Sequence, residues 1–165
     1  MRKLDPITSS IIFITIVVFG GIILAAIKSQ GIPIAQYKIT DAERPQLEIL
    51  ETNFDFGQME LSEIKTKEIV IKNRGRKPLV ISDLITSCDC TFAQLLVDGR
   101  ESPRFSMRRD SKWRDEISPA GEAKLRIIYE PRIMPVQGKV RREIVFKTND
   151  PSSLLVNLRF DAVIE

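Results

Sequence analysis

The stretch that decides the fold is Leu154-Leu155-Val156-Asn157-Leu158-Arg159-Phe160-Asp161-Ala162. Its even-numbered residues are apolar, whereas residues 157, 159 and 161 are polar or charged. Successive side chains of a β-strand point to opposite faces, so this alternation predicts a strand with one buried face. Residues 123–130 show the same alternation.

Outward from this stretch, short apolar runs predict further strands over residues 47–57, 64–73, 79–87, 91–97 and 138–147. Residues that are common in turns separate these runs, as in Asn73-Arg74-Gly75, Ser118-Pro119-Ala120-Gly121 and Asn149-Asp150-Pro151. About seven strands without a convincing amphipathic helix favour an all-β, antiparallel β-sandwich. The alternation places between the sheets Phe56, Ile71, Leu79, Leu125, Ile127, Phe146 and Leu158.

The N-terminal segment has a different character. Residues 7–27 contain no charged side chain, and about 21 helical residues span about 30 Å, the thickness of a bilayer core. The alternative is a cleaved signal peptide, but Ala25-Ala26 followed by Ile27-Lys28 is a poor cleavage site. We therefore expect a single transmembrane helix within residues 1–28 that contacts the lipid bilayer through residues 7–27. Arg2 and Lys3 favour a cytoplasmic N-terminus and an extracytoplasmic C-terminal domain.

The remainder divides into a juxtamembrane linker, residues 29–45, and the sandwich domain, residues 46–165. Gly31, Pro33 and Pro45 punctuate the linker, and no regular period runs through it.

Composition excludes several functions. The net charge is +3, and the membrane end carries two of those units, which is too little to indicate nucleic-acid binding. The chain has no histidine, which removes the commonest general base and the commonest metal ligand. We therefore expect no enzyme activity.

Six motifs in order carry a family resemblance: Phe54-Asp55-Phe56-Gly57, Ile71-Lys72-Asn73-Arg74-Gly75, Pro78-Leu79-Val80-Ile81, Ser87-Cys88-Asp89-Cys90-Thr91, Ser118-Pro119-Ala120-Gly121 and Thr148-Asn149-Asp150-Pro151. From Leu47 to Ile164 the chain resembles the bacterial domain-of-unknown-function 1573 family, which is related to the Hydin-like immunoglobulin domains. The resemblance implies an exported or membrane-anchored immunoglobulin-like sandwich with no established activity.

The two cysteines, Cys88 and Cys90, leave several interpretations open. Residues i and i+2 of a strand lie about 6.6 Å apart, so a disulfide between them needs a local bend. Such a bond predicts either thiol exchange or a structural role in which the sulfurs pack as small apolar groups. Reduced thiolates could instead bind a soft ion such as Cu(I), with a thioether from Met59, Met107 or Met134. An intermolecular disulfide or a cysteine modification is the remaining alternative.

Residues 98–116 form a charged insertion, which departs from the family pattern. Its positive and negative charges nearly cancel, and a solvated excursion is the expected structure. The chain's only tryptophan lies there among arginines, residue types that anchor protein interfaces. The partner-binding candidates are Arg104, Arg108, Arg109 and Trp113.

Two functions follow from these features. The first is a protein-binding or scaffolding module at the cell envelope. The second is a thiol-redox or copper-handling domain that uses Cys88 and Cys90.

Overall fold

The computed structural model describes residues 10, 12–21, 34–108, 110 and 112–165. Residues 1–33 and 34–165 are two separate units. In the first unit, residues 12–21 are helical and their large apolar side chains are exposed. The predicted membrane span, residues 7–27, extends beyond this helix to residues outside the described ranges. Over the described ranges, we find no helix with both the length and the hydrophobicity that a membrane crossing requires.

In the second unit, ten strands and one short 3-10 helix, η1 (Pro131–Ile133), are described. The strands are β1 (Leu47–Ile49), β2 (Asn53–Met59), β3 (Lys65–Asn73), β4 (Leu79–Thr86), β5 (Thr91–Val97), β6 (Arg100–Glu101), β7 (Arg114–Ile117), β8 (Glu122–Tyr129), β9 (Gly138–Thr148) and β10 (Leu155–Ile164).

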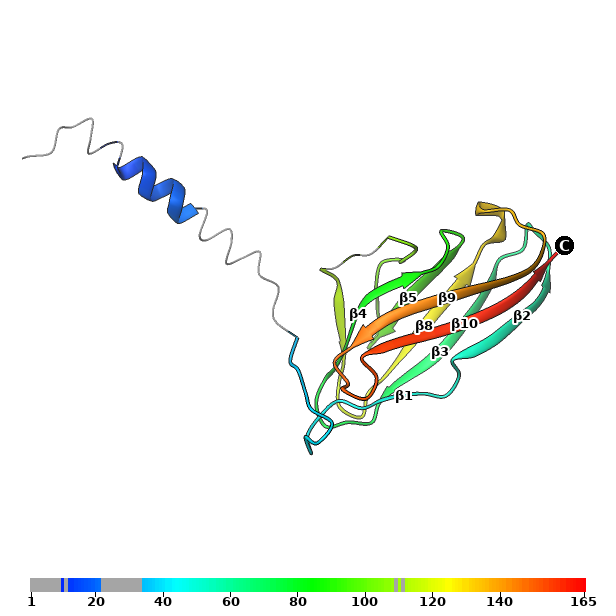
Figure 1. Cartoon of the computed structure of the whole chain (residues 1–165), viewed down its shortest axis with the longest axis horizontal. Coiled ribbons are helices and arrows are strands. Elements are labelled where there is room, and N and C mark those ends of the chain that lie inside the picture. Colours follow the sequence, from blue (N-terminus) through cyan, green and yellow to red (C-terminus); the bar gives the residue numbers. More distant parts are fainter. Residues whose placement is uncertain (1–9, 11, 22–33, 109, 111) are drawn as a thin grey trace, which may run out of the picture. The chain divides into compact units, whose positions relative to one another are not determined.

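The strands form two five-stranded sheets, with the orders β1-β3-β8-β5-β6 and β2-β10-β9-β4-β7 (Figure 1). Neighbouring strands are antiparallel, except that β2 pairs in parallel with β10. In β10, the side chains of Val156, Leu158 and Phe160 are buried, as the alternation predicts. The predicted all-β sandwich is confirmed.

The core lies between the sheets and contains six of the seven side chains predicted for it. Ile71, Leu79, Leu125, Ile127, Phe146 and Leu158 are fully buried. The seventh, Phe56, is half-buried because it lies on the edge strand β2. Its ring still packs edge-on against Phe160, with 4.9 Å between the ring centroids.

The predicted number of strands, about seven, is corrected to ten in the described part of the chain. The first predicted strand, residues 47–57, is divided in two because β1 pairs with β3 in one sheet and β2 pairs with β10 in the other. The chain crosses between the sheets at residues 50–52. The other two additional strands, β6 and β7, lie in the insertion.

The insertion, residues 98–116, is also corrected: it is not a solvated excursion throughout. β7 pairs with β4, and Phe105 forms a bridge to Ala93 and is only 5% exposed. The near-zero net charge of the insertion did not reveal this contribution, because Phe105, and Ile117 just after the insertion, are apolar residues buried among solvated charges.

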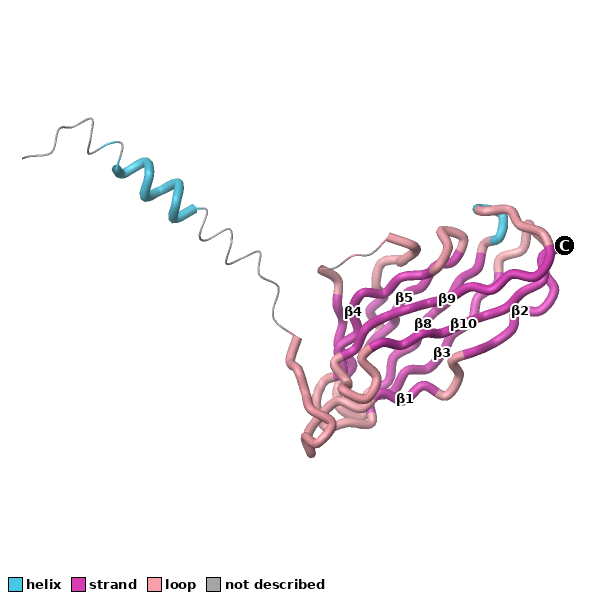
Figure 2. The backbone as a smooth tube through the Cα atoms, viewed as in Figure 1, coloured by secondary structure: helices cyan, strands magenta, loops and turns pink. Residues whose placement is uncertain are grey.

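The loops of the sandwich gather at two opposite ends (Figure 2). The distal end includes residues 60–64, 87–90, 106–108 and 130–137. The proximal end comprises residues 44–46 and the turns 74–78, 118–121 and 149–153. Of the predicted linker, residues 29–33 lie outside the described ranges, and residues 34–45 belong to the second unit.

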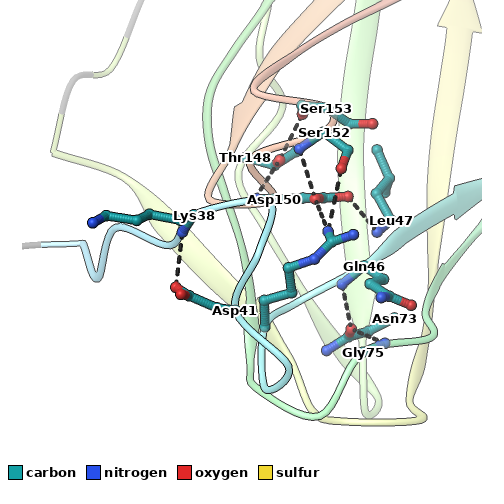
Figure 3. Close-up of polar contacts among 11 residues, drawn as sticks. Lys38, Asp41, Gln46, Leu47, Asn73, Gly75, Thr148, Asp150, Ser152 and Ser153 are labelled. Carbon is teal, nitrogen blue, oxygen red and sulfur yellow. Dashed lines mark hydrogen bonds and ion pairs between the residues drawn. The ribbon is translucent and has the colours of Figure 1, made fainter.

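At the proximal end, the fully buried Asn73 holds three backbone segments together. Its Nδ2 donates to the carbonyl oxygens of Lys77 and Ile117, at 2.8 and 3.0 Å. Its Oδ1 accepts from the backbone N–H of Gly75 and of Gln46, at 2.9 and 3.3 Å (Figure 3). A Cβ atom at position 75 would clash with the backbone oxygen of residue 44, so glycine is required there.

Asp150 attaches the end of the linker to the same region (Figure 3). Its Oδ2 accepts from the backbone N–H of Leu47 at 2.9 Å. Its Oδ1 accepts from the backbone N–H of Ser152 at 2.9 Å and pairs with Nη1 of Arg44 at 3.0 Å. The point at which the linker joins the sandwich is therefore fixed.

Candidate functional site: the cysteine corner of the distal end

The cysteine corner, residues 87–90, connects β4 to β5 at the distal end. Cys88 and Cys90 are joined as a disulfide, and their Cα atoms are 5.1 Å apart. This separation is shorter than that of an extended strand, because a turn brings the backbone N–H of Thr91 to 3.1 Å from the carbonyl oxygen of Cys88. The structure thus provides the bend that a bond between these cysteines needs.

Backbone and hydroxyl groups hold the corner in place. The Oγ1 of Thr86 lies 2.8 Å from the carbonyl oxygens of both Cys88 and Thr91. The carbonyl oxygen of Cys90 accepts from the backbone N–H of Glu130 at 2.8 Å, which ties the corner to the segment that contains η1. Both cysteines are buried, and Cys90 is completely so. A disulfide that is buried and flanked by backbone hydrogen bonds in this way has the environment typical of structural disulfides.

Asp89 joins the insertion to the corner. Its Oδ1 accepts from the Oγ of Ser106 at 2.8 Å and from the backbone N–H of Met107 at 3.4 Å. The backbone N–H of Thr86 donates to the carbonyl oxygen of Ser106 at 3.0 Å. The side chain between the cysteines therefore positions Met107 beside them.

Exposed apolar side chains lie on the two segments that are hydrogen-bonded to the corner. Met107, Ile133, Met134 and Val136 are 51%, 47%, 46% and 43% exposed. We call these four side chains the apolar rim. Sequence reasoning named Met107 and Met134 only as metal ligands and missed Ile133 and Val136. The available signal was the run Ile133-Met134-Pro135-Val136, which is apolar but lies outside any alternating segment.

The predicted partner-binding residues lie in different surroundings. The side chain of Arg104 is 53% exposed, pairs with Glu130 at 3.5 Å and has its guanidinium 5.7 Å from the ring centroid of Phe92. Arg108 is exposed. Arg109 lies outside the described residues.

Trp113 is half-buried and packs against the core. Its ring centroid lies 4.6 Å from that of Phe105. The structure thus brings the arginines at 104 and 108 to the surface and gives Trp113 contacts within the domain.

The predicted soft-metal ligands are brought together in part. The Sγ of Cys88 lies 3.7 Å from the Sδ of Met134, which comes from the other side of the corner. Met59, the third predicted thioether, is buried at the end of β2. The described residues contain no cluster of three or more cysteine, aspartate or glutamate side chains suited to a metal ion.

Comparison with known proteins found similar solved structures. A crystal structure of a protein of unknown function from Porphyromonas gingivalis W83 is 26% identical to this chain, with a TM-score of 0.57. The match covers 76% of this chain and 49% of that protein, so the chain spans about half of its length. The ASH / PapD-like domain 7 of human CEP192 matches 83% of this chain and 94% of its own, at 15% identity and a TM-score of 0.43.

Among curated proteins, none matches this chain significantly. Residues 47–98 match a family of proteins of unknown function, DUF1573, the family that the sequence motifs resemble. The matched region runs from β1 through the cysteine corner to the end of β5.

Proposed function

We propose that this chain is a membrane-anchored, extracytoplasmic β-sandwich of the immunoglobulin-like, Hydin-related type whose distal end binds a protein partner at the cell envelope. The observation that carries the proposal is the apolar rim, because four large apolar side chains stand exposed around a rigid corner. Exposed patches of apolar side chains on a folded domain mark interaction surfaces, whereas single scattered ones do not.

The composition of the distal end fits a protein interface. Methionine and arginine are enriched in such interfaces, and the rim combines two methionines with exposed Arg104, Arg108 and Arg132. A matching partner presents apolar side chains at its centre and carboxylates at its edge. The disulfide and the hydrogen bonds hold the backbone of the corner and of the η1 turn, which lowers the entropy lost on binding.

The proximal end supports the anchored arrangement. Asp150 and Asn73 fix the residues where the linker joins the sandwich, at the end opposite the apolar rim. The helix at residues 12–21 exposes apolar side chains of the kind that contact lipid.

No catalytic residue is part of this proposal, since the chain has no histidine. Thiol exchange is the less favoured alternative, because Cys90 is completely buried and only Cys88 offers a sulfur to a reductant.

A capture experiment tests the binding surface. The full chain is crosslinked in membranes of the source organism, and bound proteins are identified by mass spectrometry. Changing Ile133 and Val136 together to serine should reduce recovery of the partner about tenfold or more, which corresponds to about 1.4 kcal/mol. The matched control changes Leu154 and Leu155 to serine, because these side chains are 60% and 64% exposed beside the proximal turn. Equal recovery by both variants contradicts the proposal.

Protease treatment of spheroplasts tests the anchor separately. Protease added outside should degrade the domain beyond residue 45 and leave a membrane-embedded fragment. A fully protected domain with an accessible N-terminus would reverse the proposed orientation.

A further inference from the structure

Two sulfur atoms from different segments of the chain are in contact at the distal end. The Sγ of Cys88 lies 3.7 Å from the Sδ of Met134. Two sulfurs that each lie about 2.3 Å from a shared metal ion are about 3.8 Å apart at a tetrahedral angle and about 4.0 Å apart at a trigonal angle. These two sulfurs are therefore already spaced as ligands of a single ion.

The fold holds the thioether in this position. The backbone N–H of Glu130 donates to Cys90, and the buried Pro131 begins the η1 turn immediately afterwards. The backbone N–H of Met134 closes that turn by donating to the carbonyl oxygen of Pro131 at 3.2 Å. Met134 is thus brought to the corner by hydrogen bonds of the backbone, while its 46% exposure leaves a route for an ion from solvent.

We propose that the reduced form of the corner is a Cu(I) site, with the thiolates of Cys88 and Cys90 and the thioether of Met134 as its three ligands. The proposal stands independently of the protein-binding function. Soft thiolate and thioether ligands select Cu(I), which accepts three-coordinate sites. A closed zinc site takes four ligands, and hard ions prefer oxygen. The nearest carboxylate, Asp89, is already bonded to Ser106 and Met107.

The site forms by a balanced two-electron reduction. A thiolate of an extracytoplasmic protein dithiol attacks the Sγ of Cys88, the less deeply buried sulfur, and the Cys88–Cys90 bond breaks. Cys90 leaves as a thiolate, and the second thiol of the reductant then displaces Cys88 and closes the reductant's own disulfide. Two protons are taken up by the freed cysteines and are released again when Cu(I) binds both as thiolates.

Polar groups of the corner lie close to both sulfurs. The backbone N–H of Cys90 points at the Sγ of Cys88, with 3.0 Å between nitrogen and sulfur. The Oγ1 of Thr91 lies 4.0 Å from the Sγ of Cys90. An N–H group directed at sulfur stabilises the negative charge that a metal-binding thiolate carries.

The test uses the full chain in detergent, reduced with dithiothreitol, desalted without oxygen and titrated with Cu(I) against bicinchoninate. The reduced chain should bind a single Cu(I) ion, and the oxidised chain none. Met134→Leu should lower the affinity by about tenfold or more, since even outer-shell partners of a metal contribute that much. Met107→Leu is the matched control, because Met107 is a similarly exposed rim methionine bonded to Asp89, and it should leave the affinity unchanged.

X-ray absorption at the copper edge gives an independent readout. The wild-type chain and Met107→Leu should show three sulfur ligands, and Met134→Leu should show two. The proposal is overturned if the reduced chain binds no stoichiometric Cu(I), or if Met134→Leu matches the wild type in both affinity and sulfur count. The Ile133 and Val136 serine variant should bind Cu(I) normally, so failure of the metal site and failure of partner binding remain distinguishable.

Discussion

The Nη1 atom of Arg44 lies 3.0 Å from the Oδ1 of Asp150, whose side chain is only 3% exposed. This pair joins the last residues before β1 to the turn between β9 and β10, which are 106 residues apart in the chain. The carboxylate also receives the backbone N–H groups of Leu47 and Ser152. An acidic side chain therefore holds the entry of the sandwich to its last hairpin.

Asp150→Asn should lower the free energy of unfolding by about 3 kcal/mol, because it leaves Arg44 and two N–H groups without their charged acceptor. Chemical denaturation of the full chain in detergent measures the loss. The control is Lys77→Ala, since Lys77 pairs with Glu43 at 3.1 Å but both side chains are largely exposed. That variant should stay within about 0.5 kcal/mol of the wild type. Equal losses in the two variants would mean that Asp150 does not hold the entry strand.

Phe146→Ala should cost about 3–5 kcal/mol, because the ring is fully buried between the sheets. Arg159→Ala, on the outer face of β10, removes only an exposed ion pair with Glu143 and should cost less than about 1 kcal/mol. Thermal unfolding of the two variants side by side provides the comparison. Similar melting temperatures would be inconsistent with the assignment of faces.

The sequence was sufficient for the sandwich because burial on one face imposes a period of two. Strand β10 shows that period throughout, and β8 shows it until Ile128, which is also buried. The exceptions have physical causes. Arg142 lies in phase with the core residues of β9, yet the structure accommodates it half-buried opposite Phe160. Strand β7 has four residues, too few for a period to be recognised, and its existence depends on pairing with β4.

The candidate site could be predicted only in part. The close spacing of Cys88 and Cys90 was visible in the sequence, and Met134 could be named only as one of three thioethers. Its selection depends on the backbone contact between Cys90 and Glu130, which brings together segments that are 40 residues apart. A contact between segments so far apart leaves no pattern in the local amino-acid sequence.

Trp113→Ala should lower the free energy of unfolding by about 2 kcal/mol or more, since the indole packs on the buried ring of Phe105. Trp113→Phe should recover most of that loss because it keeps an aromatic contact. Unfolding measurements should be paired with the partner-capture assay. Unchanged stability together with lost capture would show instead that Trp113 is an interface anchor, as its sequence context suggests.

Tyr129 should make the domain sensitive to alkali. Burial raises the pKa of its phenol, and the nearby positive charge of Arg142 offsets only part of that effect. Because the folded pKa lies above the unfolded value, this contribution to stability is complete below about pH 10 and is lost as the pH rises through the folded pKa.

Tyr129→Phe tests this dependence, because the phenol oxygen is buried and makes no hydrogen bond within the described part of the chain. At neutral pH the variant should be within about 1 kcal/mol of the wild type. Its unfolding temperature should fall less between pH 9 and pH 11 than that of the wild type. Parallel decline of the two proteins over that range would assign the alkaline loss to other groups.

Site-specific photo-crosslinking in intact cells tests whether the distal end carries the binding surface. Photoreactive p-benzoylphenylalanine is placed at Met107, in the apolar rim, or at Leu155, which is 64% exposed at the proximal end of β10. The account predicts a discrete covalent adduct from position 107 and none from position 155. An adduct from position 155 alone, or from neither position, would contradict it.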